Sequence, residues 1–320
     1  MAARVLVGTC SWTDPTLIAC GRFYPPGVSS AEARLRYYAS QFPLVEVDST
    51  YYAPPSARTS ALWAARTPDG FVFDVKAYAL LTGHMVRRER LPAWLREALL
   101  PGRGEKPTVY ARDLDAAAVE RLWQAHREAL APLAAAGRLG VVVFQFPPWF
   151  VRSAAAERYL AELPGRLPGL RLAVEFRGGR WLDGPATAAA TFALLERLGL
   201  SYVCVDEPQG FPNSTPPLTA VTAPVAVARL HGRNRRTWQL RTSVSSERFK
   251  YLYTDAELRE WVPRVEGLAR EADEVHVLFN NNYEDWGVRN ARRMAALLGL
   301  GAPAGGAADA RQGRLELGEE

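Results

Sequence analysis

The chain has 320 residues, of which 48% are hydrophobic and 23% are charged, a composition typical of a soluble globular protein with a sizeable core. No apolar run approaches the roughly 20 residues of a membrane-spanning helix, and the N-terminus lacks a signal-peptide pattern, so we expect no membrane association and a cytoplasmic location. The net charge of +5 mildly favours anionic partners, and the three cysteines, which form no metal-binding pattern, suit a reducing compartment.

Eight short segments rich in β-branched and aromatic residues follow one another along the chain, and each ends in polar residues. They span 4–9, 44–48, 71–76, 140–146, 171–177, 201–206, 225–231 and 274–280. Helical patterns span 29–42, 56–67, 115–137, 154–163, 185–200, 254–270 and 288–300. Ser29 with Glu32, and Thr254 with Glu257, have the spacing of capping boxes, which predicts where two of these helices begin.

The alternation of strands and helices predicts the fold class. Strands that alternate with helices pair in parallel, since a parallel crossover needs a connection of helix length. Eight such units predict an α/β fold with one domain, a closed (β/α)8 TIM barrel, over residues 1–300. The rival, a doubly wound open sheet, would need a Gly-rich phosphate-binding turn after the first strand, and the sequence GTCSWTD is not one.

Three segments depart from the regular alternation. Residues 77–112, between the third strand and its helix, include the Pro/Gly-rich piece 99–107 and predict a surface insertion. Residues 207–224, after the sixth strand, contain several prolines and no helical period, so we expect the sixth helix to be short or missing. The Ala/Gly-rich tail, 301–320, is predicted to be disordered.

The predicted strands end in an unusual number of polar residues. The active site of a TIM barrel lies at the C-terminal ends of its strands, and residues two apart on a strand share one face. We therefore expect these side chains to point into the barrel mouth: Glu46, Asp48, Asp74, Lys76, Gln145, Glu175, Arg177, Asp206, Arg229, His231, Asn280, Asn281 and Asn282. They could form an ion network that only plugs the barrel, but convergence from many strands favours a binding site.

Seven motifs occur in order: VEVDSTYY (45–52), FVFDVKAYALLTGH (71–84), VVFQFPPWF (142–150), VEFRGGRW (174–181), ARLHGRNRRTW (228–238), YLYTDAELREW (251–261) and FNNNYEDWGVRNA (279–291). Together they resemble the YecE-like family, catalogued as domain of unknown function 72. The resemblance runs from Gly8 to Leu298 and implies a TIM barrel, but it implies no reaction. Two positions differ from the family pattern: Cys10 stands where Ser is more usual, and Gly178 stands where a His often follows Glu-Phe-Arg.

The segment 227–238, VARLHGRNRRTW, is the strongest indication of a ligand. TIM barrels often bind phosphate on the loops after strands seven and eight, and Arg side chains match the geometry of phosphate oxygens. We expect a phosphate-bearing ligand, with a nucleic acid or nucleotide first and a sugar phosphate second, although a solvated basic turn would have the same composition. The expected ligand-binding residues are Arg177, Arg229, Arg233, Asn280, Asn281, Trp238, Gln145, Asp48 and Asp74.

Phosphoester hydrolysis is the enzymatic hypothesis, and nucleic-acid binding without chemistry is its alternative. In the first, His231 or Glu175 would transfer a proton. Lys76 would act as a nucleophile or base only with a lowered pKa, and the surrounding carboxylates favour instead a salt bridge to Asp74, Glu46 or Glu175. The candidate catalytic residues are His231, Glu175, Lys76, Asp206 and Glu46.

A glycoside hydrolase is the second enzymatic hypothesis. It would use two of the carboxylates Glu46, Asp48, Glu175 and Asp206 as acid and nucleophile. The cations expected in the same mouth would disfavour its positively charged transition state, so this hypothesis ranks below phosphate binding.

A metal site is the weakest expectation, since the chain has four histidines and His126 lies in a helical pattern that predicts exposure. His84 and His231 are the candidate ligands for a divalent metal, but the arginines around His231 oppose a divalent cation. We expect no cofactor, and no sequence feature names a protein partner.

Overall fold

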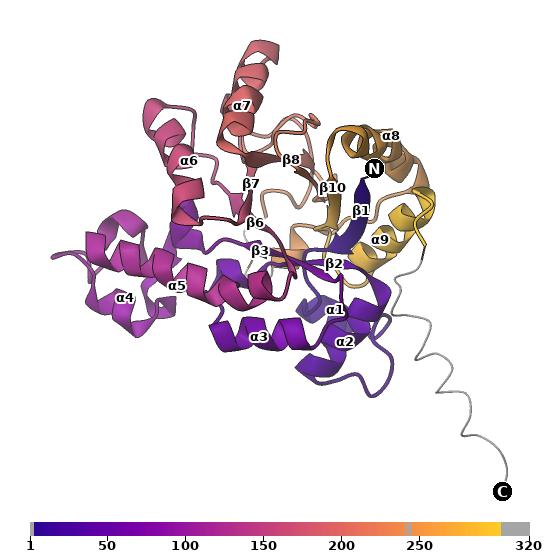
Figure 1. Cartoon of the computed structure of the whole chain (residues 1–320), viewed down its shortest axis with the longest axis horizontal. Coiled ribbons are helices and arrows are strands. Elements are labelled where there is room, and N and C mark those ends of the chain that lie inside the picture. Colours follow the sequence, from indigo (N-terminus) through magenta and orange to yellow (C-terminus); the bar gives the residue numbers. More distant parts are fainter. Residues whose placement is uncertain (1–2, 241, 243–244, 302–320) are drawn as a thin grey trace, which may run out of the picture.

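Eight parallel strands close into a barrel in the computed structural model, which describes residues 3–240, 242 and 245–301 (Figure 1). The strands are β1 (Arg4–Thr9), β2 (Leu44–Val47), β3 (Val72–Lys76), β6 (Leu139–Gln145), β7 (Arg171–Glu175), β8 (Leu200–Asp206), β9 (Val225–Leu230) and β10 (Glu274–Phe279). They follow one another around the barrel in chain order, and β10 closes on β1. The prediction of a (β/α)8 barrel is therefore confirmed.

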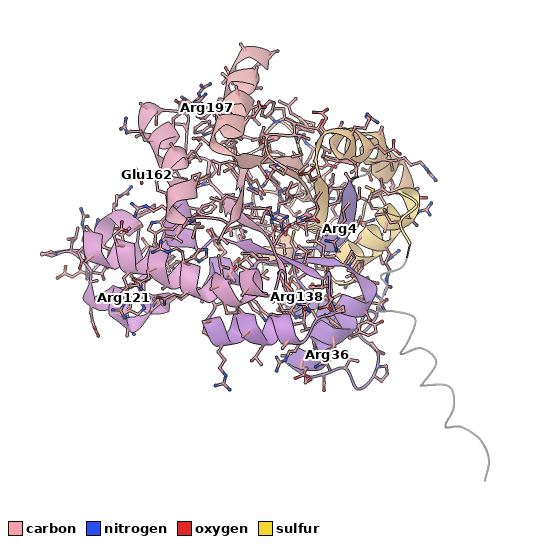
Figure 2. All side chains as sticks on the ribbon, in the orientation of Figure 1. Arg4, Arg36, Arg121, Arg138, Glu162 and Arg197 are labelled. Carbon is pink, nitrogen blue, oxygen red and sulfur yellow. The ribbon has the colours of Figure 1, made fainter. Side chains whose placement is uncertain are left out.

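Helices surround the strands and send charged side chains outward, as the labelled Arg121, Glu162 and Arg197 illustrate (Figures 1 and 2). These helices are α1 (Pro15–Ala19), α2 (Ala31–Gln41), α3 (Ala57–Ala65), α5 (Ala116–Ala135), α6 (Ala154–Arg166), α7 (Pro185–Leu198), α8 (Asp255–Glu271) and α9 (Trp286–Leu297). None of the described helices is long and apolar enough to cross a membrane.

One of the two predicted capping boxes is confirmed. Thr254 and Glu257 cap each other's backbone N–H groups at the start of α8. At α2 the prediction is wrong by one position, because Ser30, not Ser29, accepts the hydrogen bond from the N–H of Ala33. Glu32 pairs there with Arg36 one turn further on.

Two of the three expected departures from the regular barrel are present. The insertion after β3 contains α4 (Ala93–Glu97) and a two-stranded antiparallel sheet, β4 (Val86–Arg87) and β5 (Thr108–Val109). No helix forms between β8 and β9, where all residues are described, so the sixth helix is missing as predicted. The predicted disordered tail lies, from residue 302 on, outside the described residues.

Asp74 faces the barrel interior at its N-terminal end, so the expectation that it points into the mouth is wrong. Its carboxylate lies 2.8 Å from Nδ1 of His276 and accepts the N–H of Val141 at 2.8 Å. Gly140 leaves the space for it, because a Cβ there would overlap the Asp74 carboxylate. Burial alone would lower the pKa of His276, but Asp74 and then Glu274 raise it to about 9.

His126 is buried against the helix layer, although its pattern predicted exposure. Its side chain is inaccessible to solvent, and neither ring nitrogen has a hydrogen-bond partner among the described residues. Burial lowers the pKa of His126 to about 4, so the ring is neutral at physiological pH.

Candidate functional site

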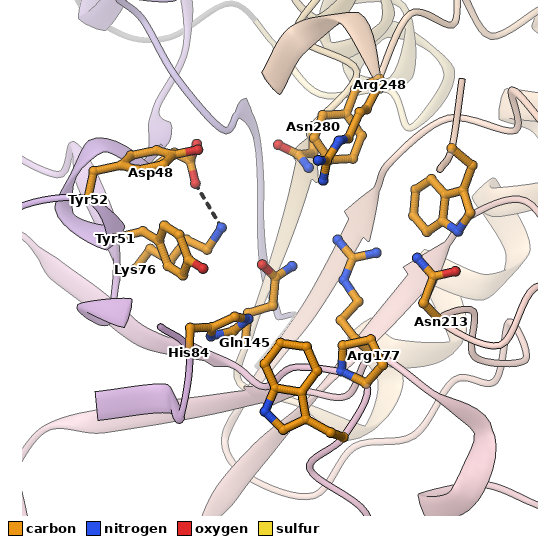
Figure 3. Close-up of a pocket in the computed structure, with 14 residues that line it drawn as sticks. Asp48, Tyr51, Tyr52, Lys76, His84, Gln145, Arg177, Asn213, Arg248 and Asn280 are labelled. Atoms are coloured by element: carbon orange, nitrogen blue, oxygen red, sulfur yellow. Dashed lines mark hydrogen bonds and ion pairs between the residues drawn. The ribbon is translucent and has the colours of Figure 1, made fainter. Parts of the chain in front are cut away.

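A pocket of about 330 Å³ opens at the C-terminal ends of the strands (Figure 3). Its walls come from the ends of β3 and β6 and from the segments that follow β2, β3, β6, β7, β8, β9 and β10. The described lining residues are Asp48, Tyr51, Tyr52, Lys76, His84, Gln145, Pro148, Trp149, Arg177, Asn213, Trp238, Arg248, Phe249 and Asn280. The structure therefore brings together six of the residues expected to bind a ligand or act in catalysis: Asp48, Lys76, Gln145, Arg177, Trp238 and Asn280.

A second hollow of about 170 Å³ adjoins this pocket and shares Asp48, Tyr52, Phe249 and Asn280 with it. Hydroxyl groups from the loop after β1, including Ser11 and Thr13, line its far side. The two hollows together provide a polar cleft that is longer than the first pocket alone.

Arg229 lies inside the barrel among buried carboxylates. It has no solvent exposure, donates to Glu46 at 2.6 Å and pairs with Glu175 through its other terminal nitrogen. The expectation that Arg229 clamps a phosphate is therefore wrong: two buried carboxylates already pair with its two terminal nitrogens, and the side chain does not reach the pocket.

Glu175 connects this buried pair to the pocket. Glu175 also forms an ion pair with Nε of Arg177 at 2.8 Å, and Arg177 in turn donates a hydrogen bond to Glu207 at 2.6 Å. Burial alone would raise the pKa of Glu175, but the neighbouring cations, Arg229 first, hold that pKa well below its usual range. Glu175 is thus an ionised anchor for Arg177, and it does not line the pocket.

Glu46 is the less well stabilised carboxylate of the network. One of its oxygens has no partner among the described residues, and burial, which Arg229 and Lys76 only partly offset, raises its pKa to about 7. Glu46 is completely buried and does not line the pocket either.

His231 is 1% exposed and lies outside the pocket lining. Its Nδ1 is 2.8 Å from the amide nitrogen of Asn280, and its Nε2 is 3.3 Å from Glu175. Burial first, and then Arg177, lower the pKa of His231 to about 3. The ring is therefore neutral and enclosed. This position does not support the hypothesis that His231 transfers a proton to a ligand in the pocket.

Lys76 forms a salt bridge, as the sequence predicted, but its partner is Asp48 at 2.9 Å and none of the three expected carboxylates. Its ammonium also lies 4.7 Å from the centre of the Tyr51 ring. Burial alone would lower the pKa of Lys76, but Asp48 outweighs it and the pKa is raised. Lys76 is therefore a charged wall of the pocket, which does not favour a nucleophile.

Asp206 points away from the mouth, so the prediction that its side chain lies there is wrong. Its carboxylate accepts hydrogen bonds from Nε1 of Trp261 at 2.9 Å and from Nε of Arg233 at 3.0 Å. Arg233 also pairs with Glu260 at 2.8 Å and does not line the pocket, so the expectation for Arg233 is wrong too. Both side chains connect the end of β8 to helix α8.

Glu207 occupies the position that had been expected of Asp206. It is 1% exposed, receives Arg177, and accepts the N–H of Thr215 at 2.7 Å. Burial outweighs Arg177 and raises the pKa of Glu207 to about 7. The inward side chains of β8 are Val203 and Val205, so strict alternation would have identified Glu207 from the sequence.

Asn281 faces the helices, so the prediction that it binds the ligand is also wrong. Its amide donates to the carbonyl of Tyr251 and to Asn290, both at 2.8 Å. Asn282 borders only the second hollow of the cleft, where its amide lies 3.3 Å from Asn280.

Six of the fourteen described lining residues were missed, and they come from loops. The missed lining residues are Tyr51, Tyr52, Pro148, Asn213, Arg248 and Phe249. Tyr51, Tyr52 and Pro148 lie within the family motifs, which was the available signal. His84 does reach the mouth, but the described residues contain no cluster of three or more His, Cys, Asp and Glu side chains that could hold a metal ion.

Comparisons with known proteins agree with the fold and the motifs. Residues 6–312 match the family described as "Protein of unknown function DUF72". The UPF0759 protein YunF of Bacillus subtilis (strain 168) is 31% identical over 300 residues, 92% of this chain and 95% of that protein. A DUF72 family protein from Enterococcus faecalis V583 has a TM-score of 0.72 and 27% identity, over 93% of this chain and 99% of its own.

A DUF72 family protein from Thermotoga maritima MSB8 also has a TM-score of 0.72, with 29% identity over 92% of this chain and 99% of its own. The family match covers nearly the whole barrel and includes all seven motifs. The chain therefore belongs to the DUF72 family, the YecE-like family that its motifs resemble.

Proposed function

We propose that the pocket binds a phosphate-bearing ligand that also carries a flat ring, namely a nucleotide or the end of a nucleic-acid strand. The observation that carries this proposal is the convergence of Lys76, Arg177 and Arg248 on one pocket (Figure 3). Among the described lining residues Asp48 is the single carboxylate. Cations in a partly enclosed pocket attract anions, and guanidinium groups match phosphate oxygens in geometry.

Arg248 has the greatest freedom to meet a ligand. Its side chain is exposed, its Nε donates to the carbonyl of Leu240, and it forms no ion pair with any described residue. Arg177 is held in place by Glu175 and Glu207, which do not line the pocket, and Lys76 is held by Asp48 within the pocket wall. Because the pKa values of Glu46 and Glu207 are about 7, part of the negative charge beneath the pocket is neutralised near neutral pH.

Aromatic side chains supply surfaces for a base. Trp149 is 56% exposed and Tyr52 is 44% exposed at the pocket, which is unusual for rings of this size on a soluble surface. Trp238 lies beneath Arg177, whose guanidinium is 5.1 Å from the ring centre. Rings of this kind stack on bases with little sequence preference.

Binding is favoured over the two hydrolytic hypotheses. Phosphoester hydrolysis by His231 and Glu175 would require them at the pocket surface, and both are buried outside it. A glycoside hydrolase needs two carboxylates facing the substrate, and among the described residues that line the first pocket only Asp48 does so. Asp14 lines the second hollow, where its carboxylate accepts from the N–H and the hydroxyl of Thr16.

Titration with inorganic phosphate and with adenosine 5′-monophosphate, followed by calorimetry at several salt concentrations, tests the proposal. At about pH 5.5, below the second pKa of a phosphate ester at about 6, both ligands carry an acidic proton. We expect both to bind, the nucleotide more tightly, with affinities that fall as salt rises. The Arg248→Ala variant should bind both ligands about tenfold more weakly, because it loses one hydrogen bond between charged groups. Arg236→Ala is the matched control, because Arg236 is exposed on the same loop but does not line the pocket.

The Trp149→Ala variant distinguishes binding of the base from binding of the phosphate. It should weaken the binding of adenosine 5′-monophosphate and leave the binding of inorganic phosphate unchanged, since stacking involves the base alone. Salt-independent binding of a neutral sugar, together with no detectable phosphate binding, would contradict the proposal and favour the carbohydrate hypothesis.

A further inference from the structure

We propose that His84 determines which anion this pocket accepts: its Nε2 presents a lone pair to the pocket and accepts the proton of a bound hydrogen phosphate group, so the pocket prefers hydrogen phosphate to sulfate. This inference rests on the proposed phosphate site and names the residue that makes it specific. Its basis is the hydrogen bonding of His84 and Thr82.

Thr82 fixes the tautomer of His84. The Thr82 hydroxyl is buried at the end of a short helical turn (Ala79–Thr82), and its oxygen lies 3.0 Å from the carbonyl oxygen of Ala79 and 2.8 Å from Nδ1 of His84. A hydroxyl has one proton to donate. A carbonyl oxygen accepts only, so we place the proton between Thr82 and Ala79, which avoids two oxygen lone pairs facing each other at 3.0 Å.

The consequence is a defined proton position on His84. Because the Thr82 hydroxyl donates to Ala79, its oxygen accepts from His84, and Nδ1 of His84 carries the proton. Nε2 of the neutral ring then has a free lone pair. No described residue donates to Nε2, and His84 lines the pocket, so this lone pair is open to a ligand.

The backbone and two rings hold His84 in this orientation. The N–H of His84 donates to the same Ala79 carbonyl at 3.0 Å, and Gly83 turns the chain with a φ of 74°. The His84 ring packs edge-on against Tyr51 and Trp149, with centres 5.2 Å and 5.9 Å away. Its orientation is therefore set before a ligand arrives.

His84 lies between the cations of the pocket. Figure 3 shows it beside Lys76 and Tyr51, with Arg177 on the other side of Gln145. Burial first, and then Lys76 and Arg177, lower the pKa of His84 to about 3. The ring is consequently an acceptor throughout the physiological pH range, and an anion held by these two cations lies within its reach.

Phosphate and sulfate differ in the one respect that this acceptor detects. Slightly above neutral pH both are tetrahedral dianions of similar size, but phosphate carries one acidic proton and sulfate carries none. Hydrogen phosphate can donate that proton to Nε2, whereas sulfate would direct an oxygen lone pair at the nitrogen lone pair. A site with a placed polar group rejects the analogue that leaves it unpaired.

Competition between inorganic phosphate and sulfate, measured by calorimetry on the whole protein slightly above neutral pH, tests the inference. We expect the wild type to prefer phosphate by about tenfold or more, the effect of one hydrogen bond to a charged group. His84→Phe keeps a ring between Tyr51 and Trp149 but removes both nitrogens, and it should bind the two anions about equally.

Two substitutions at Thr82 form a matched pair. Thr82→Ser keeps the hydroxyl and should keep the preference. Thr82→Val has nearly the same shape but cannot accept from Nδ1, so the proton should move to Nε2 and the preference should disappear. Nitrogen-15 NMR of the His84 ring, identified by its loss in His84→Phe, reports the tautomer directly and independently of any anion.

The outcomes separate this inference from the proposed function. Equal binding of phosphate and sulfate by the wild type, or a proton on Nε2 in the free protein, would overturn the role of His84 and leave the phosphate site standing. Binding of neither anion would overturn the phosphate site and this inference with it. Loss of the preference in both His84→Phe and Thr82→Val, with retention in Thr82→Ser, supports the inference.

Discussion

Arg229 and Glu175 form an ion pair whose two side chains are both completely sealed from solvent inside the barrel. The pair sits directly below the pocket, and the second interaction of Glu175, with Arg177, carries its influence to the pocket wall. The buried charges therefore act on the site by holding Arg177, which follows β7 and lines the pocket, in place.

Arg229→Met should destabilise the fold strongly, because it leaves Glu46 and Glu175 as buried carboxylates without their cation. Removing one partner of a buried pair costs about 3–5 kcal/mol of the free energy of unfolding. Urea denaturation followed by circular dichroism measures the change. Arg36→Met is the control: its pair with Glu32 is largely exposed, and the expected loss is about 0–1 kcal/mol. Equal losses in both variants would contradict the assignment.

His276 should make the protein less stable as the solution becomes alkaline. The pKa of His276 is about 9 in the folded protein, against 6.5 for an ordinary His in the unfolded chain, so the folded state binds the proton more tightly. This stabilisation is complete below pH 6.5 and is lost as the pH rises through 9. Denaturation series across that range should show the decline, and His276→Gln should remove it. A wild-type stability that is flat from 6.5 to 9 would disprove the paired, charged state of His276.

His126 should have the opposite effect, on the acid side. Its pKa is lowered to about 4, so the folded state excludes the proton, and its contribution is present above pH 6.5 and lost as the pH falls through 4. His126→Leu removes two unpaired buried nitrogens, and we expect it to keep or raise stability at neutral pH and to reduce the acid loss. Thermal melts of both proteins at neutral and acid pH provide the check. A variant that is destabilised at both pH values would mean that His126 has a partner.

Gly8→Ala and Gly267→Ala should have effects of opposite sign. A Cβ at Gly8 would overlap the backbone carbonyl of Leu44 on the neighbouring strand, which cannot move without opening the barrel. We expect a loss of at least about 3 kcal/mol or a failure to fold. Gly267 lies in the interior of α8, where a Cβ makes only ordinary contacts, so alanine should add about 0.5–1 kcal/mol. Soluble yield and urea midpoints of the two variants compare them directly.

Much of the barrel could be predicted from local patterns. Segments such as 4–9 and 225–231 read as strands because β-branched residues are concentrated in them, and the expected bounds lie close to the observed ones. Alternation also placed Arg229, Glu175 and Lys76 correctly on the inner face of their strands. Helix starts were less certain, and the one-residue error at Ser29 shows that two adjacent serines compete for one cap.

Local sequence patterns could not predict how deep in the barrel each inward side chain lies. Asp74 and Lys76 share an inner face, yet Asp74 lies with His276 at the N-terminal end and Lys76 lines the pocket. The tilt and stagger of the strands set this height, and both depend on the closure of the whole barrel. For the same reason Arg229 proved to be enclosed although its strand reaches the mouth.

Local sequence patterns were enough to predict the eight strands, the helices between most of them, the missing sixth helix, the insertion after β3 and the family, because each depends on residues that are neighbours in the chain. The tertiary structure alone decided which polar side chains meet. It placed Glu207 rather than Asp206 beneath the pocket, and it brought His84, Lys76 and Arg177 together around a common space. These contacts depend on distances between separate strands and loops, which only the closed barrel defines.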